Sequence, residues 1–65
     1  MTAYKVGDVV RYAPKWCGPG EEKFIHVVLE VHEREEKTQY RIQTLNTDLF
    51  LPPTEEVDEE MIIKA

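Results

Sequence analysis

Apolar and polar side chains alternate along much of the chain with a period of two residues. In the clearest stretch, residues 23–33, an aliphatic side chain occupies every second position: Ile25, Val27, Leu29 and Val31. A strand has this period, whereas a helix would turn Ile25 and Val27 about 200° apart. We therefore predict a strand here, with these four side chains on its buried face.

The neighbouring segments continue the same pattern. Residues 38–45 predict a second strand that buries Tyr40 and Ile42, and the charged residues 34–37 predict a hairpin loop between the two. Upstream, a turn at Gly7-Asp8 precedes a strand that ends before Pro14, because proline cannot donate a ladder hydrogen bond. Val10 and Tyr12 share one face of that first strand.

Turn residues divide the rest of the chain. Pro19-Gly20 predicts a type II turn in the long loop of residues 15–22, since glycine permits the positive φ of the second position. Residues 46–48 predict a tight turn, followed by a short strand at 49–51. For the tail we predict one helical turn at 54–59, with Thr54 as its N-cap, and a final strand at about 60–64. A longer helix is the alternative, because Val57 and Met61 are one helical turn apart.

This order of elements resembles the SH3-like barrel. The opening Val6-Gly7-Asp8-Val9-Val10 looks like the start of many bacterial SH3-like and KOW-type domains, and residues 51–62 look like their fourth strand, short helix and fifth strand. The resemblance implies an all-β fold, a five-stranded SH3-like barrel with one short helical (3₁₀) turn before the last strand, in which residues 1–65 form a single domain. The chain lacks the Ala-Leu-Tyr-Asp-Tyr-like opening and paired tryptophans of eukaryotic signalling SH3 domains.

Length and composition favour a binding module over an enzyme. A core formed by 65 residues rarely supplies more than about 3–5 kcal/mol of stability, which leaves little to support a strained active site. The single cysteine, Cys17, excludes an internal disulfide and is typical of a reducing compartment. The sequence shows no signal segment and no apolar run of about 20 residues, so we expect a cytoplasmic protein that does not cross a membrane.

The net charge of −5 is concentrated at the C-terminal end. Residues 1–48 carry a balance of −1 and residues 49–65 a balance of −4. Such a segment repels phosphate backbones, so we expect only weak, non-specific affinity for nucleic acid. The loop at residues 15–23 is neutral, whereas a nucleic-acid-binding KOW domain is usually basic there.

No motif predicts catalysis, a metal or a cofactor. Cys17, His26 and His32 are the only soft metal ligands, and their spacing matches neither a structural nor a catalytic zinc site. We interpret His26 and His32 as ordinary surface histidines and Cys17 as a loop thiol without special reactivity. A nucleophilic pair of Cys17 and His26 would lack an orienting third group.

The candidate partner-binding residues combine loop aromatics with acids. Trp16, the only tryptophan, lies in a loop rich in glycine and proline, where large aromatics commonly dominate binding. We expect a contact surface formed by Tyr12, Trp16, Glu21, Glu22 and Phe50. The alternative is that Trp16 closes the open end of the barrel as part of the core.

The function predicted from these features is a non-enzymatic module that binds a protein or peptide. Two alternatives are an RNA- or ribosome-associated barrel of KOW type and an accessory subunit that docks on a larger enzyme. A basic stripe formed by Lys15, Lys23, Arg11 and Arg41 would favour nucleic acid. An aromatic groove flanked by acids would favour a basic or proline-rich peptide, and a large exposed apolar patch would favour the docking subunit.

Overall fold

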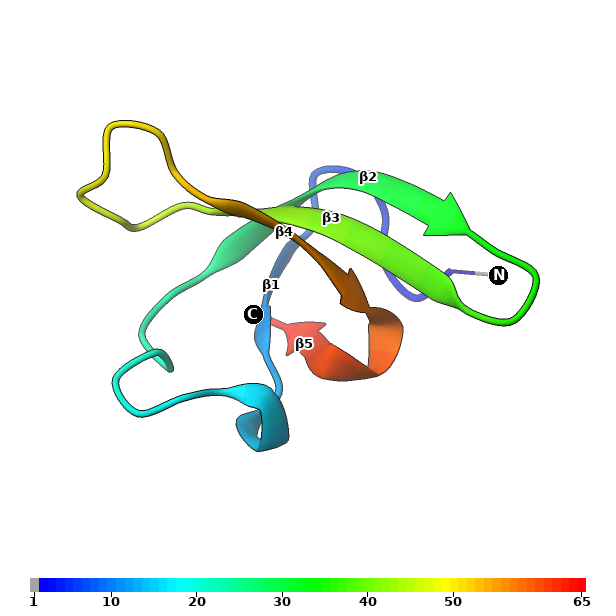
Figure 1. The fold of residues 1–65 in the computed structure, drawn as a ribbon, viewed down its shortest axis with the longest axis horizontal. Coiled ribbons are helices and arrows are strands. Elements are labelled where there is room, and N and C mark those ends of the chain that lie inside the picture. The colour runs from blue at the N-terminus through cyan, green and yellow to red at the C-terminus, as the bar shows by residue number, and fades with distance from the viewer. Residues whose placement is uncertain (1) are drawn as a thin grey trace.

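The computed structural model describes residues 2–65 as an all-β fold (Figure 1). Its strands are β1 (Val9–Tyr12), β2 (His26–Glu33), β3 (Thr38–Thr44), β4 (Thr54–Asp58) and β5 (Ile62–Lys64). Two 3₁₀ turns, η1 (Pro14–Trp16) and η2 (Glu59–Met61), follow β1 and β4. The all-β part of the prediction, with five strands and a 3₁₀ turn before the last strand, is thus confirmed over residues 2–65. Within the same residues, no helix has the length and apolar character needed to cross a membrane.

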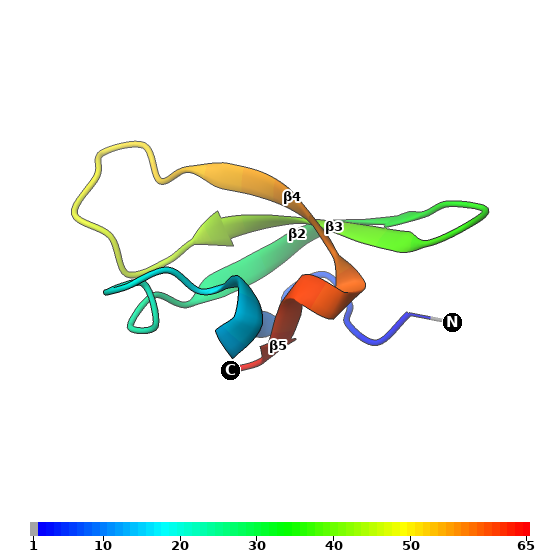
Figure 2. The ribbon, with the colours of Figure 1, turned by 60° about the horizontal axis from the view of Figure 1, so that its bottom comes forward.

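The strands form one antiparallel sheet in the order β4-β3-β2-β1-β5. The sheet is curved, so that β2, β3 and β4 lie above β5 and the two 3₁₀ turns in Figure 2. A side-chain contact shows the same curvature: the Tyr12 hydroxyl on β1 donates a hydrogen bond to Glu55 on β4, although β2 and β3 separate these strands in the sheet. The concave face therefore encloses the core.

Every strand contributes one or two inward-facing side chains to the core. Its fully buried apolar members in residues 2–65 are Val10, Val28, Tyr40, Ile42, Val57 and Ile62. Tyr4, Tyr12, Val31 and Met61 pack against this cluster while remaining partly exposed. The predicted inward positions of Tyr40 and Ile42 are confirmed.

A β-bulge changes the parity of β2, and the prediction is wrong there. The pairing with β3 shifts between Val28 and Glu30, which leaves Leu29 as an extra residue without a cross-strand partner. Val28 consequently faces the core, while Leu29 is 37% exposed. Val27 is only half-buried and Ile25 precedes the strand. Val31, beyond the bulge, returns to the core side as predicted.

The tail differs from the prediction in its boundaries. Residues 49–51 form no strand, and the fourth strand is instead Thr54–Asp58, which pairs with β3 along its whole length. Thr54 is therefore a strand residue and not a helix N-cap, and the helical turn lies at 59–61. The physical reason is that Pro52 and Pro53 have no amide N–H to donate to a neighbouring strand, so the strand begins only at Thr54. The final strand, Ile62–Lys64, agrees with the predicted one.

The predicted turns at Gly7-Asp8 and Pro19-Gly20 are confirmed, whereas residues 46–48 belong to the open loop between β3 and β4 and form no tight turn. Gly20 has a φ of +81°, as a type II turn after Pro19 requires, and Gly7 has a φ of +95° in the turn before β1. The charged hairpin is closed by a hydrogen bond of 2.9 Å from the Arg34 amide to the Lys37 carbonyl.

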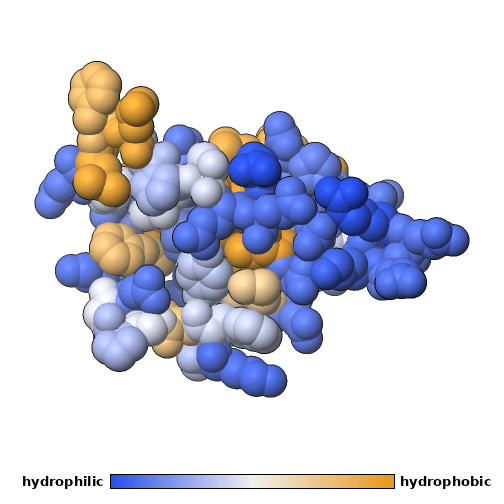
Figure 3. All heavy atoms as spheres, viewed as in Figure 1, coloured by the Kyte–Doolittle hydropathy of each residue, from blue (hydrophilic) through white to orange (hydrophobic). Residues whose placement is uncertain are grey.

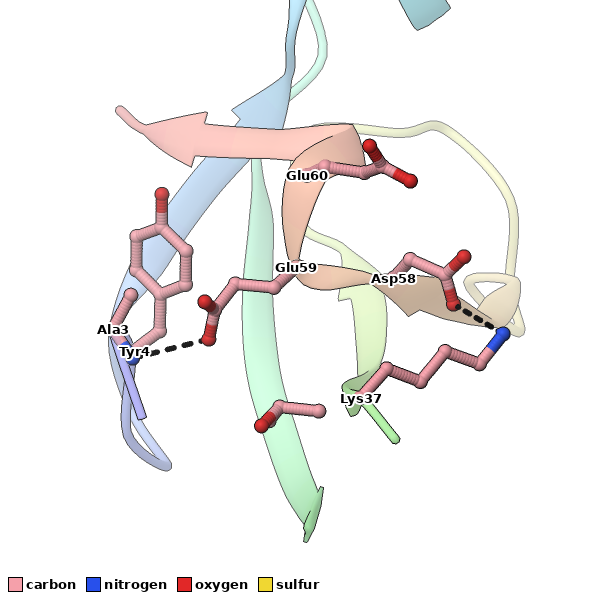
Figure 4. Close-up of a pocket in the computed structure, with 7 residues that line it drawn as sticks. Ala3, Tyr4, Lys37, Asp58, Glu59 and Glu60 are labelled. Atoms are coloured by element: carbon pink, nitrogen blue, oxygen red, sulfur yellow. Dashed lines mark hydrogen bonds and ion pairs between the residues drawn. The ribbon is translucent and has the colours of Figure 1, made fainter. Parts of the chain in front are cut away.

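The N-terminal segment is fastened to η2 beside a hollow of about 460 Å³ (Figure 4). In that view Glu59 points toward the N-terminal segment, while Asp58 points toward the Lys37 ammonium at 3.3 Å. Glu59 accepts hydrogen bonds from the Tyr40 hydroxyl at 2.5 Å and from the Ala3 amide at 3.2 Å. Asp58 and Glu59 thus hold separate chain segments together at this hollow.

Candidate functional site

A groove of about 220 Å³ opens at one end of the curved sheet, between the loop that precedes β2 and the loop that precedes β4. It is lined by Tyr12, Glu21, Phe24, His26, Thr44, Thr47, Leu49, Pro53 and Glu55. These residues come from four strands and two loops, so the groove is a product of the fold and of no single sequence segment.

The floor of the groove continues the inward face of the sheet beyond the core. On each of four strands, a polar or amphipathic residue lies two positions from a buried core residue. The pairs are Val10 and Tyr12, Val28 and His26, Ile42 and Thr44, and Val57 and Glu55. Because side chains two apart on a strand share a face, the core gives way at this end to a layer of hydroxyl, imidazole and carboxylate groups.

Hydrogen bonds and ring contacts connect this layer. The Tyr12 hydroxyl bonds to Glu55, and the rings of Tyr12 and His26 meet edge to face with centroids 5.1 Å apart. His26 Nδ1 lies 3.1 Å from the Thr44 hydroxyl. Burial, together with the Glu55 and Glu21 carboxylates, raises the pKa of Tyr12, so its hydroxyl stays a hydrogen-bond donor at neutral pH.

His26 is a buried member of this layer, which corrects its interpretation as a surface histidine. It is only 6% exposed, and burial lowers the pKa of its imidazole, although the Glu55 and Glu21 carboxylates act in the opposite direction. His32, by contrast, lies on the outer surface and contacts Glu30 at 2.9 Å. The uncharged form of His26 is thus the one that the fold favours.

We expect the stability of the domain to fall as the pH drops below about 6.5, the usual pKa of histidine. Because the pKa of His26 is lowered in the folded state, the unfolded chain binds more protons in this range, and the free energy of unfolding declines with decreasing pH. Urea denaturation at about pH 7.5 and 5.5 measures this decline. His26→Gln should reduce it, and an equal decline in wild type and variant would contradict the prediction.

The two loops that wall the groove are joined by Asn46. Its side-chain oxygen accepts a hydrogen bond of 2.8 Å from the Ile25 amide, and its side-chain nitrogen donates one of 2.7 Å to the Lys23 carbonyl. A backbone bond of 2.9 Å from Leu45 to Ile25 reinforces the junction. The predicted turn residue therefore also sets the distance between the groove walls.

An apolar tip projects from the loop that precedes β4. We define the apolar tip as Leu49, Phe50 and Leu51, all of which are strongly exposed, with Phe50 at 96%. Figure 3 shows hydrophobic side chains standing out from this loop, above the otherwise mostly hydrophilic face. Leu49 belongs both to the tip and to the groove wall, so the two surfaces are continuous.

The structure brings only part of the predicted contact surface together. Tyr12 and Glu21 line the groove, and Phe50 stands at the neighbouring apolar tip. Trp16 ends η1 and is 44% exposed; it belongs neither to the core nor to the groove lining, and the Lys15 ammonium lies 5.8 Å from its ring. Glu22 is exposed on the loop outside the lining.

Several groove residues were not predicted from the sequence. Phe24 and His26 belong to the stretch with the strongest alternation, but parity placed them on the outer face. Glu55 was assigned to a helical turn, whereas it lies on β4. Pro53, for which no role in binding was predicted, is also a lining residue. The alternation of Glu55 and Val57, which lie opposite Ile42 and Tyr40, contained the signal, once β4 is recognised as a strand.

Cys17 and His32 lie outside the groove lining. Partial burial and the Glu22 and Glu21 carboxylates raise the pKa of the Cys17 thiol, which reduces the thiolate that a nucleophile requires. In the part of the chain that the structure describes, no group of three His, Cys, Asp or Glu side chains is arranged to hold a metal ion. The groups of the groove that could contact a ligand are therefore its polar floor and its apolar walls.

In comparisons with known proteins, no family model, no curated protein and no solved structure matches the chain.

Proposed function

We propose that this chain is a non-enzymatic interaction module of the SH3-like barrel type, which binds a segment of a protein partner in the groove and on the apolar tip. The observation that carries the proposal is the exposure of the tip beside a preformed groove. Soluble proteins rarely expose a contiguous group of large apolar side chains, such as Phe50 and its two leucine neighbours, unless that surface binds a partner. Loops on a rigid sheet are the usual place for recognition.

The groove has the composition of a recognition site. Tyr12 and Phe24 supply aromatic area, while Glu21 and Glu55 supply negative charge at the same place. Aromatic side chains contribute much of the binding energy at interfaces, and charged groups contribute partner selectivity and faster encounter. This combination supports a partner segment that carries both apolar and basic residues.

The tip also supports the related possibility that the module is a subunit docked on a larger protein, since apolar surface is what a lasting interface buries. The nucleic-acid alternative has less support. Arg41, one of four cations that would form a basic stripe, is engaged by Glu30 at 3.8 Å and Glu56 at 3.6 Å. Its charge is therefore partly neutralised before any phosphate approaches.

Affinity capture with purified, immobilised protein tests the proposed function. We expect wild-type protein to retain a defined partner from a native lysate, and the double variant Phe50→Ala/Leu51→Ala to lose it, because the tip is the main apolar contact. Quantitative mass spectrometry compares the two captures. Circular dichroism should show both proteins equally folded, since neither side chain belongs to the core.

Val6→Ala provides the matched control. Val6 is also an exposed aliphatic residue, but it lies in the turn before β1, away from the groove lining. The control should retain the partner as wild type does. Capture of the same proteins by the double variant and by wild type would refute binding through the tip.

A further inference from the structure

We propose that the groove receives the guanidinium of one arginine side chain from the partner, held by the Glu55 carboxylate and the aromatic walls. This inference deepens the proposed function and rests on it, because the arginine belongs to the bound segment. Three features of the groove carry it: uncompensated negative charge, aromatic surface and small size.

Within the described residues, 2–65, no lysine or arginine forms an ion pair with the acids of the groove. Among residues 2–65, the ion pairs of lysine and arginine engage Glu30, Glu56 and Asp58, all outside the groove. Glu21 accepts a hydrogen bond from the Gly18 amide at 2.8 Å, and Glu55 accepts one from the Tyr12 hydroxyl. Both bonds come from neutral donors and involve one carboxylate oxygen each. The groove thus holds two negative charges that its own lining, which contains no lysine or arginine, does not neutralise.

The aromatic walls suit a planar cation. A cation within about 6 Å of a ring centroid is attracted by the ring face, and arginine also stacks on it. The Phe24 ring already shows this behaviour toward the chain itself, because the Lys23 ammonium lies 5.4 Å from its centroid. A guanidinium has five N–H donors in a rigid plane. It can therefore donate hydrogen bonds to the Glu55 carboxylate and to the neighbouring polar groups of the groove floor.

The size of the groove limits its occupant to one side chain. Its volume of about 220 Å³ lies below the range of roughly 300–1,000 Å³ that is typical of sites for drug-sized ligands. A negatively charged group, such as a phosphate, would meet Glu21 and Glu55 at short range and be repelled. An uncharged side chain would bring no positive charge to neutralise the two carboxylates.

Titration with small probes, followed by nuclear magnetic resonance of the ¹⁵N-labelled full chain, tests the inference. The probes are N-acetyl-arginine amide and N-acetyl-citrulline amide, which has the same shape but no charge. We expect the arginine probe to shift the amide signals of Tyr12, Phe24 and Glu55, and to bind at least roughly tenfold more tightly than the citrulline probe. Equal affinity of the two probes, or shifts spread over other surfaces, would overturn the inference.

Two charge-matched variants complete the test. Glu55→Gln keeps an acceptor for Tyr12 but removes the charge, and it should weaken arginine binding by roughly tenfold. Glu36→Gln removes the same charge in the hairpin between β2 and β3, away from the lining, and should bind as wild type does. Phe24→Leu, which keeps the wall apolar, should also weaken binding. Equal affinities of Glu55→Gln and Glu36→Gln would reduce the effect to net charge and refute the site.

The outcome is distinguishable from that of the proposed function. A partner captured through the tip, combined with no preference for arginine over citrulline, leaves the interaction module intact and refutes the guanidinium site. Arginine binding confined to the groove, without any captured partner, supports the site and refutes binding through the tip.

Discussion

Replacing Ile42 with alanine is expected to lower the free energy of unfolding by about 2–5 kcal/mol. Ile42 is fully buried on β3, opposite Val28 on one side and Glu55 on the other, at the centre of the core cluster. A domain of this size has a total stability of about 3–5 kcal/mol, so most of the variant should be unfolded at room temperature. Urea denaturation followed by circular dichroism measures the loss.

Leu29→Ala is the matched control, because it removes the same number of methyl and methylene groups from a different environment. Leu29 is the extra residue of the bulge and is more than one-third exposed. We expect this change to cost less than about 1 kcal/mol, as for most surface substitutions. A larger cost for Leu29→Ala than for Ile42→Ala would show that β2 follows the simple alternation of its sequence and contains no bulge.

The bulge explains why the sequence predicted β3 correctly and β2 only in part. On β3, Arg41 separates Tyr40 from Ile42, and large apolar residues occupy only one of the two alternating sets of positions. On β2, both parities carry large apolar groups, since Val28 interrupts the series of Ile25, Val27 and Leu29. Alternation alone cannot reveal an inserted residue, because a bulge exchanges the two faces without changing composition.

The candidate site was predictable only in part. Turn residues and aromatic residues mark Tyr12, Glu21 and Phe50 as candidates in the sequence. The groove floor depends on β1 and β4 approaching across the concave face, a contact between residues 43 positions apart in the chain. Such a contact follows from sheet curvature, which no local pattern of two or four residues encodes.

Tyr40→Phe is expected to destabilise the domain by about 1–3 kcal/mol at neutral pH, because the change removes a hydroxyl with two partners. That hydroxyl donates to Glu59 at 2.5 Å and accepts from the Tyr4 amide at 3.3 Å, while the ring stays in the core. The variant therefore separates the contribution of the hydroxyl from that of core packing. Urea denaturation of wild type and variant over a range of pH provides the measurement.

The loss caused by Tyr40→Phe should shrink as the pH falls below about 4.5, the ordinary pKa of a glutamate. The hydrogen bond from Tyr40, with a smaller effect of the Ala3 amide, lowers the pKa of Glu59. A lowered pKa in the folded state contributes stability above the unfolded value, and this contribution disappears as Glu59 is protonated. Tyr4→Phe is the control, because its hydroxyl donates to the uncharged Ile62 carbonyl at 3.2 Å and its loss should stay constant with pH. A loss for Tyr40→Phe that is equally constant would show that the hydrogen bond from Tyr40 does not depend on the charge of Glu59.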